Sequence, residues 1–266
     1  MRSILALMRV SWLSAISYRL GTVISLAGLL ASVVPIYFIT GAVQSVAAAS
    51  IRTEGGNYFG FVIVGMAAIY VLSAAVSAIP GALAGSIGSG TFESLTVTRT
   101  SLPTILVGMS GYPLLQSLIR AALLLGGAAV MGVDIAWRTL PFVAVILALM
   151  VLAYGAIGLV AAALVLVFRT SGPLLTAVIA GSGLLGGVYY STAAIPGWLQ
   201  ALSGIIPLTY ALRATRMLLL GDASFAQVGG DVGILSLIAA AGLAFGGIAF
   251  VAALRHARRS GSLSQY

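Results

Sequence analysis

Apolar residues of this chain gather in long, charge-free runs that short polar segments separate. A helix needs roughly 20 residues to cross a hydrocarbon core about 30 Å thick, and the runs are about that long. They lack the strict alternation of apolar and polar positions that marks the strands of a membrane barrel. We therefore predict six transmembrane helices, over residues 20–43, 57–79, 105–131, 140–168, 173–190 and 232–254.

Two further segments depart from this simple pattern. Near the N-terminus, Ile4, Met8 and Trp12 fall on one helical face and Arg9 on another, which predicts a helix lying in the membrane interface. A basic flank that simply anchors the first span is the alternative. Residues 195–220 are apolar but contain two prolines and two arginines, so we expect a pair of short re-entrant helices at the outer face.

Composition agrees with an all-α polytopic membrane protein. Apolar residues make up 61% of the chain and charged residues 7%, and the mean hydropathy is +1.15. A soluble domain has about 45–50% apolar and about 25% charged residues. We find no linker or low-complexity segment, so residues 1–266 are predicted to form a single transmembrane domain.

The arginines predict the orientation of the chain, because cytoplasmic loops collect basic residues. With the N-terminus inside, the inner segments carry a net charge of +7 and the outer segments a net charge of zero. The inner set is Arg2, Arg9, Arg19, Arg99, Arg169, Arg255, Arg258, Arg259 and Glu93, and the outer set is Arg52, Arg138, Arg213, Arg216, Glu54, Asp134, Asp222 and Asp231. We predict a multi-pass protein of the plasma (inner) membrane with both termini in the cytoplasm.

Two missing residue types exclude several kinds of chemistry. Without cysteine there is no disulfide or thiolate, and without lysine there is no phosphate-binding P-loop and no Schiff base. His256 stands alone in the basic tail, so we expect no metal site. No basic stripe with interleaved aromatic residues points to nucleic acid. Any ATP that powers this protein must bind to another chain.

A polar island interrupts the apolar runs at residues 86–103, with the sequence SIGSGTFESLTVTRTSLP. Phe92 and Leu95 alternate with Glu93 and Arg99, which predicts a short amphipathic helix or turn at a membrane surface. An ordinary connection between two spans is the alternative.

This island resembles the coupling segment of ABC type-2 exporter permeases, the membrane subunits of drug, lipid and polysaccharide exporters. The resemblance implies that the segment receives the stroke of the ATPase, that Glu93 makes the polar contact, and that Arg99 is a candidate donor to its carboxylate. The matching residues are Gly90, Thr91, Phe92, Glu93, Leu95, Thr98 and Ser101.

Residues 195–222 resemble the re-entrant outer segment that precedes the last helix in the same family. The functional interpretation is an outer gate or a contact to lipid headgroups, with Asp222 or Asp231 as partners of the arginines. Arginines that snorkel to the outer interface are the alternative. The candidate residues are Pro196, Trp198, Pro207, Tyr210, Arg213 and Arg216.

Arg120 is an ionisable residue inside the third predicted span, with Gln116 one turn earlier. Such residues often mark a pathway. If the helix begins near residue 101, Arg120 lies roughly 28 Å along it and can snorkel to the far interface. If the Gly-Tyr-Pro sequence at residues 111–113 bends the helix, Arg120 lies deeper. Both interpretations stay open, as does the choice between helix packing and a dimer face for Gly242, Gly246 and Gly247.

The resemblance implies a permease that pairs with a second permease subunit, identical or related, and with two ABC ATPase subunits. ATP and Mg would be held by the ATPases, and this chain would bind no cofactor. The resemblance implies outward movement of a hydrophobic or amphipathic substrate such as a drug, a lipid or a lipid-linked glycan. An ATP-independent carrier or channel is the alternative, although only Arg120 qualifies as an ionisable residue for ion coupling.

Overall fold

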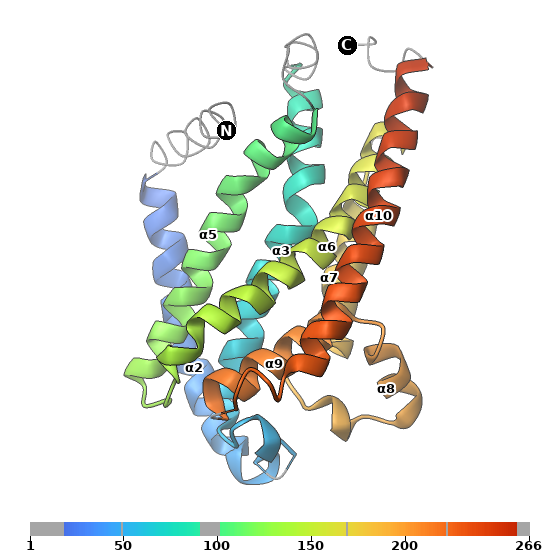
Figure 1. Ribbon diagram of the computed structural model, residues 1–266. Coiled ribbons are helices and arrows are strands. Elements are labelled where there is room, and N and C mark those ends of the chain that lie inside the picture. Colours follow the sequence, from blue (N-terminus) through green and yellow to red (C-terminus); the bar gives the residue numbers. More distant parts are fainter. Residues whose placement is uncertain (1–18, 49, 91–101, 169, 222, 260–266) are drawn as a thin grey trace.

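A computed structural model describes residues 19–48, 50–90, 102–168, 170–221 and 223–259 of the chain. In these ranges the regular structure is entirely helical, which confirms the predicted all-α class (Figure 1). The long helices are α2 (Arg19–Ala47), α3 (Tyr58–Gly88), α5 (Leu102–Val130), α6 (Leu140–Phe168) and α10 (Gly229–Arg259). The shorter elements are η1 (Arg52–Glu54), η2 (Trp137–Thr139), α7 (Gly172–Leu185), η3 (Thr192–Ala194), α8 (Gly197–Ser203) and α9 (Pro207–Leu220).

Five helices in the described ranges are long and apolar enough to cross a membrane. They correspond to five of the six predicted spans. The remaining predicted span, residues 173–190, contains α7, which has 14 residues and is therefore about 21 Å long. That is shorter than a hydrocarbon core of about 30 Å, so the sixth crossing stays a prediction. The predicted interfacial helix of residues 1–18 lies outside the described residues.

The bundle has two distinct ends (Figure 1). At one, which we call the island end, α3 finishes at Gly88, α5 begins at Leu102 and α10 finishes. At the opposite end, the α9 end, lie η1, η2, α8 and α9. Arg255 and Arg259 belong to the island end, whereas the described members of the predicted outer charge set belong to the α9 end. The described members of the two charge sets therefore lie at opposite ends, and the side of the membrane that each end faces stays a prediction.

Helix α3 forms the centre of the bundle, because it packs against α2, α5, α6, α7 and α9. Apolar residues occupy all sides of α3, as expected of a buried helix. Leu72 of α3 and Ile146 of α6 are completely buried in the core. Tyr154 of α6 is also buried, and its hydroxyl donates a hydrogen bond of 2.9 Å to Oγ of Ser182, which ties α6 to α7.

A proline and a glycine set the contact between α3 and α6. Pro80 lies inside α3 and has no N–H to donate to the carbonyl of Val76 one turn earlier. Gly158 of α6 passes close to that carbonyl: a Cβ atom at position 158 would lie 2.9 Å from the oxygen of Val76. The missing side chain thus permits the two backbones to approach closely.

Two of the three glycines singled out on the last span pack within the chain. A Cβ atom on Gly246 would lie 2.5 Å from the carbonyl oxygen of Ala156, and one on Gly242 would lie 3.1 Å from the Cβ of the same alanine. Gly247 has no atom within 4 Å of its Cβ position. Gly242 and Gly246 therefore serve the contact between α10 and α6, which favours intramolecular packing over a dimer face for these two residues.

We expect Gly246→Ala to destabilise the chain by about 1–3 kcal/mol, because the added methyl group meets backbone that cannot rotate away. Gly247→Ala is the matched control, one residue along the same helix with no atom near its Cβ position, and it should be neutral or slightly stabilising. Thermal unfolding of the purified proteins in detergent measures both. Equal melting temperatures for the two variants would contradict the close contact.

Candidate functional site

Most of the predicted coupling segment lies outside the described residues, namely Thr91, Phe92, Glu93, Leu95, Thr98, Arg99 and Ser101. Its flanks are described. Helix α3 continues nine residues past the predicted end of the second span, to Gly88, so the island begins as a helical turn and not as a loop. Gly90 then adopts a positive φ of 67°, which glycine reaches without strain. Residues 102 and 103 of the island belong to α5.

Arg216 of α9 is the most deeply buried charged side chain in the described ranges, with 2% of its surface exposed. Its Nη1 donates to Oε2 of Glu54 at 3.2 Å and to the carbonyl of Gly187 at 2.9 Å. Its Nη2 donates to the carbonyls of Val188 at 2.9 Å and Phe61 at 3.0 Å, and its Nε also reaches Phe61. We call Arg216, Glu54 and these three carbonyls the Arg216 network. It joins α9, η1, α3 and the turn that follows α7.

The network compensates for the burial of its charge. Burial lowers the pKa of Arg216 to about 10, and the nearby Glu54 opposes this decrease, so the guanidinium remains protonated at neutral pH. The guanidinium carbon also lies 3.3 Å from the ring centroid of Phe61, within the range of a cation–π contact. Such burial is incompatible with the alternative that Arg216 snorkels to lipid headgroups.

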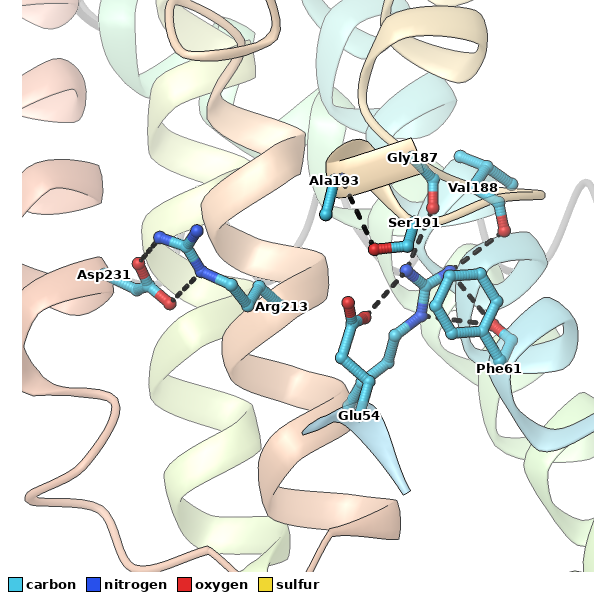
Figure 2. A network of polar contacts seen from close by, with 9 residues as sticks. Glu54, Phe61, Gly187, Val188, Ser191, Ala193, Arg213 and Asp231 are labelled. Atoms are coloured by element: carbon cyan, nitrogen blue, oxygen red, sulfur yellow. Dashed lines mark hydrogen bonds and ion pairs between the residues drawn. The ribbon is translucent and has the colours of Figure 1, made fainter. Parts of the chain in front are cut away.

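Arg213 has a different environment, although it lies three residues earlier on α9. Its guanidinium forms a two-point ion pair with Asp231 at the start of α10, on the opposite side of α9 from Glu54 (Figure 2). The hydrogen bond to Asp231 raises the pKa of Arg213, against a smaller decrease from partial burial. The side chain remains 46% exposed. Asp231 is one of the two predicted partners, and the other, Asp222, lies outside the described residues.

The two prolines of this region begin short helices, as expected of proline in a first turn. Pro196 immediately precedes α8 and Pro207 is the first residue of α9. Trp198 is 69% exposed, whereas the hydroxyl of Tyr210 donates to the carbonyl of Gly204 at 2.7 Å. Neither the exposure of Trp198 nor the hydrogen bond of Tyr210 tests whether this segment enters the membrane or forms a gate, so both roles stay predictions.

Arg120 and Gln116, the two pathway candidates, line one cavity of about 550 Å³ between α3 and α5. Nη2 of Arg120 donates to Oγ of Ser25 on α2 at 3.0 Å. Its guanidinium lies 5.9 Å from the ring centroid of Tyr70. Its Nε is buried and has no hydrogen-bond partner, a condition that costs about 1–3 kcal/mol or more for a charged group.

Helix α5 is one helix from Leu102 to Val130 that contains Pro113. Arg120 lies 18 residues after its first residue and ten residues before its last, which is about 27 Å and about 15 Å along the helix axis. The two depths considered for Arg120 both stay predictions.

The turn after α7 connects the Arg216 network to this cavity. Tyr189 contributes to the cavity wall, and the preceding residue, Val188, gives its carbonyl to Arg216. The carbonyl of Tyr189 accepts a hydrogen bond of 3.0 Å from the hydroxyl of Tyr58. Gly65 of α3 lies against the same turn, since a Cβ atom there would be 2.5 Å from the oxygen of Val188. The part of the cavity wall that Tyr189 provides is therefore held by contacts of this turn with Arg216 and Tyr58.

Sequence reasoning missed Glu54 and the carbonyls of the turn as partners of Arg216. The available signal was the outer charge balance of zero. That balance indicates that outer arginines pair with outer acidic residues, but it does not indicate which residues form each pair.

Within the described ranges, no three His, Cys, Asp or Glu residues lie close enough to hold a metal ion. The candidate site offers a guanidinium, hydroxyls and an amide, which suit the binding of an anion or a polar headgroup.

Comparison with known protein families identifies the chain. The family model of the ABC-2 type transporter matches residues 2–220. The match covers most of the sequence, so the chain belongs to the ABC-2 type transporter family, as the resemblance predicted. A search of curated proteins found no match. Family membership makes the chain a membrane permease subunit of an ABC transporter, a transport component that is not itself catalytic. The family implies ABC ATPases as the general class of partner.

Proposed function

We propose that the chain is the permease subunit of an ATP-driven exporter that moves a hydrophobic or amphipathic substrate outward by alternating access. One observation carries the proposal: α3 and α5, which flank the polar island, are the helices that provide most of the wall of the Arg120 cavity. The two helices pack against each other. A force applied to the island therefore acts on the cavity wall through two helices.

Two ABC ATPase subunits at the island end supply that force in this proposal, and they hold ATP and Mg. The absence of lysine supports this division of labour, because a P-loop requires one. A second permease subunit, identical or related, completes the translocation path. Drugs, lipids and lipid-linked glycans are the substrate classes that the resemblance implies, and membrane lipids surround the exposed apolar faces.

The test is purification of the tagged chain from its native host in mild detergent, with identification of the co-purifying proteins and an ATPase assay. We expect an ABC ATPase to co-purify. Glu93→Ala should insert normally but bind the ATPase at least about tenfold more weakly, so that less of it co-purifies, because a hydrogen bond to a charged group contributes about 1.5–3 kcal/mol. Asp134→Ala, an exposed carboxylate at the opposite end, is the control and should retain the full amount.

A chain that purifies alone and shows no ATPase activity would instead support the ATP-independent carrier or channel. Full attachment and normal transport by Glu93→Ala would contradict the role of the island in coupling, whatever the ATPase.

A further inference from the structure

We propose that the cavity beside Arg120 binds the anionic headgroup, a phosphate or a carboxylate, of an amphipathic substrate. The proposal rests on the proposed function in one respect only, namely that the bound molecule is the one exported. It narrows the substrate from amphiphiles in general to anionic amphiphiles, and it assigns the headgroup to named side chains.

The first reason is a charge inside a predicted span that has no described counter-charge. The described ion pairs are those of Arg213 with Asp231 and of Arg216 with Glu54, and neither includes Arg120. Asp134, the other described carboxylate, is exposed in the loop after α5. A cation within a membrane-spanning helix is unfavourable unless an opposite charge or water compensates it. An anionic ligand supplies that compensation.

The second reason is a set of unused hydrogen-bonding groups around Arg120. Nε of Arg120 is buried without a partner. The amide of Gln116 and the hydroxyls of Ser73 and Tyr70 also line the cavity, and no hydrogen bond joins any of them to another described residue. A guanidinium presents its N–H groups as a planar fork that matches two oxygens of a phosphate or carboxylate.

The third reason is the shape and position of the cavity. Its volume of about 550 Å³ falls in the usual range for ligand sites, about 300–1,000 Å³. Met66, Ile69 and Pro113 provide an apolar wall beside the polar groups. The cavity is not enclosed, and it lies halfway along α5. An amphiphile reaches this depth from the lipid with its tail remaining in hydrocarbon, whereas a small hydrated anion would have to leave water first.

Binding of three probes tests the proposal on the purified chain, with any co-purifying ATPase left in place, in phosphatidylcholine nanodiscs without ATP. The probes are decyl phosphate, decanol and inorganic phosphate, and empty nanodiscs give the background. We expect decyl phosphate to bind at least tenfold more tightly than decanol. Arg120→Gln should remove that preference. Arg138→Gln, which deletes the same charge from an exposed position at the α9 end, should preserve it.

A second variant covers the case in which Arg120→Gln does not fold, as judged by gel filtration. Gln116→Leu keeps the volume of the side chain, removes its hydrogen bonds and should weaken decyl phosphate several-fold without changing decanol. Equal binding of decyl phosphate and decanol to the unsubstituted chain would overturn the proposal. If inorganic phosphate binds as tightly as decyl phosphate, the proposal that the ligand is an amphiphile is overturned, and the site is one for a small anion.

The test separates this proposal from the proposed function, because it requires neither ATP nor transport. If the chain purifies without an ATPase and still binds decyl phosphate through Arg120, the exporter function is contradicted and the headgroup site is supported. If the chain co-purifies with its ATPase but binds decyl phosphate and decanol equally well, the headgroup site is contradicted and the exporter function is supported.

Discussion

We expect Arg216→Met to destabilise the chain by about 3–5 kcal/mol, as the loss of one partner of a buried ion pair does. Methionine fills much of the space of the arginine stem but donates no hydrogen bond. Glu54 then stays buried without its counter-charge, and the carbonyls of Phe61, Gly187 and Val188 lose their donor. The cost is therefore mainly that of stranded polar groups and not of an empty volume.

Thermal unfolding in detergent measures this effect, with Arg213→Met as the matched control on the same helix. Arg213 is 46% exposed, although its partner Asp231 is only 10% exposed. Water reaches the guanidinium of this pair and the three carbonyls of the Arg216 network are not involved, so we expect Arg213→Met to cost less than Arg216→Met. The double variant Glu54→Leu/Arg216→Met should be more stable than Arg216→Met, because it removes the stranded carboxylate as well. Similar losses for Arg213→Met and Arg216→Met would contradict a dominant role for the buried pair.

Gly65→Ala is expected to cost about 3 kcal/mol, at the upper end of the range for overpacking. The new methyl group would lie 2.5 Å from the carbonyl oxygen of Val188 and 2.9 Å from Nη2 of Arg216. Both are parts of one hydrogen bond, so the turn after α7 must move away and the bond lengthens. Hydrogen exchange should consequently increase at residues 187–190, beside the Arg120 cavity.

Gly81→Ala is the control for this substitution. It lies on the same helix, it is exposed, and no atom lies within 4 Å of its Cβ position. Alanine is a better helix former than glycine by about 1 kcal/mol, so Gly81→Ala should be neutral or slightly stabilising. Unchanged hydrogen exchange at residues 187–190 in Gly65→Ala would show that the turn tolerates the methyl group and that α3 does not hold it.

The long helices were predictable from sequence because lipid leaves the backbone a single local solution, in which each helix satisfies its own hydrogen bonds. The run at 140–168 matches α6 residue for residue. Where the apolar run ends, the signal weakens. Helix α3 continues through Ala82, Ser86 and Gly88, and the hydroxyl of Ser86 donates to the carbonyl of Ala82, so this polar side chain is accommodated within the helix.

Partners were predictable only where they are near in sequence. Asp231 follows Arg213 by 18 residues and opens the next long helix, and it was among the two candidates. Glu54 and Arg216 are 162 residues apart and meet only because η1 packs under α9. Nothing in a local pattern carries that information. The coupling role of Glu93 stays a prediction, since it depends on a contact with another chain.

The proline of α3 has a mechanical consequence. Because Pro80 gives no hydrogen bond to Val76, α3 bends at this point at lower cost than elsewhere along its length. Phe61 and Gly65 lie on one side of this point, held by α9, and the last turns before the polar island lie on the other. The turns of α3 between Pro80 and Gly88 can therefore tilt relative to the rest of the helix, while the half beside Arg216 remains fixed.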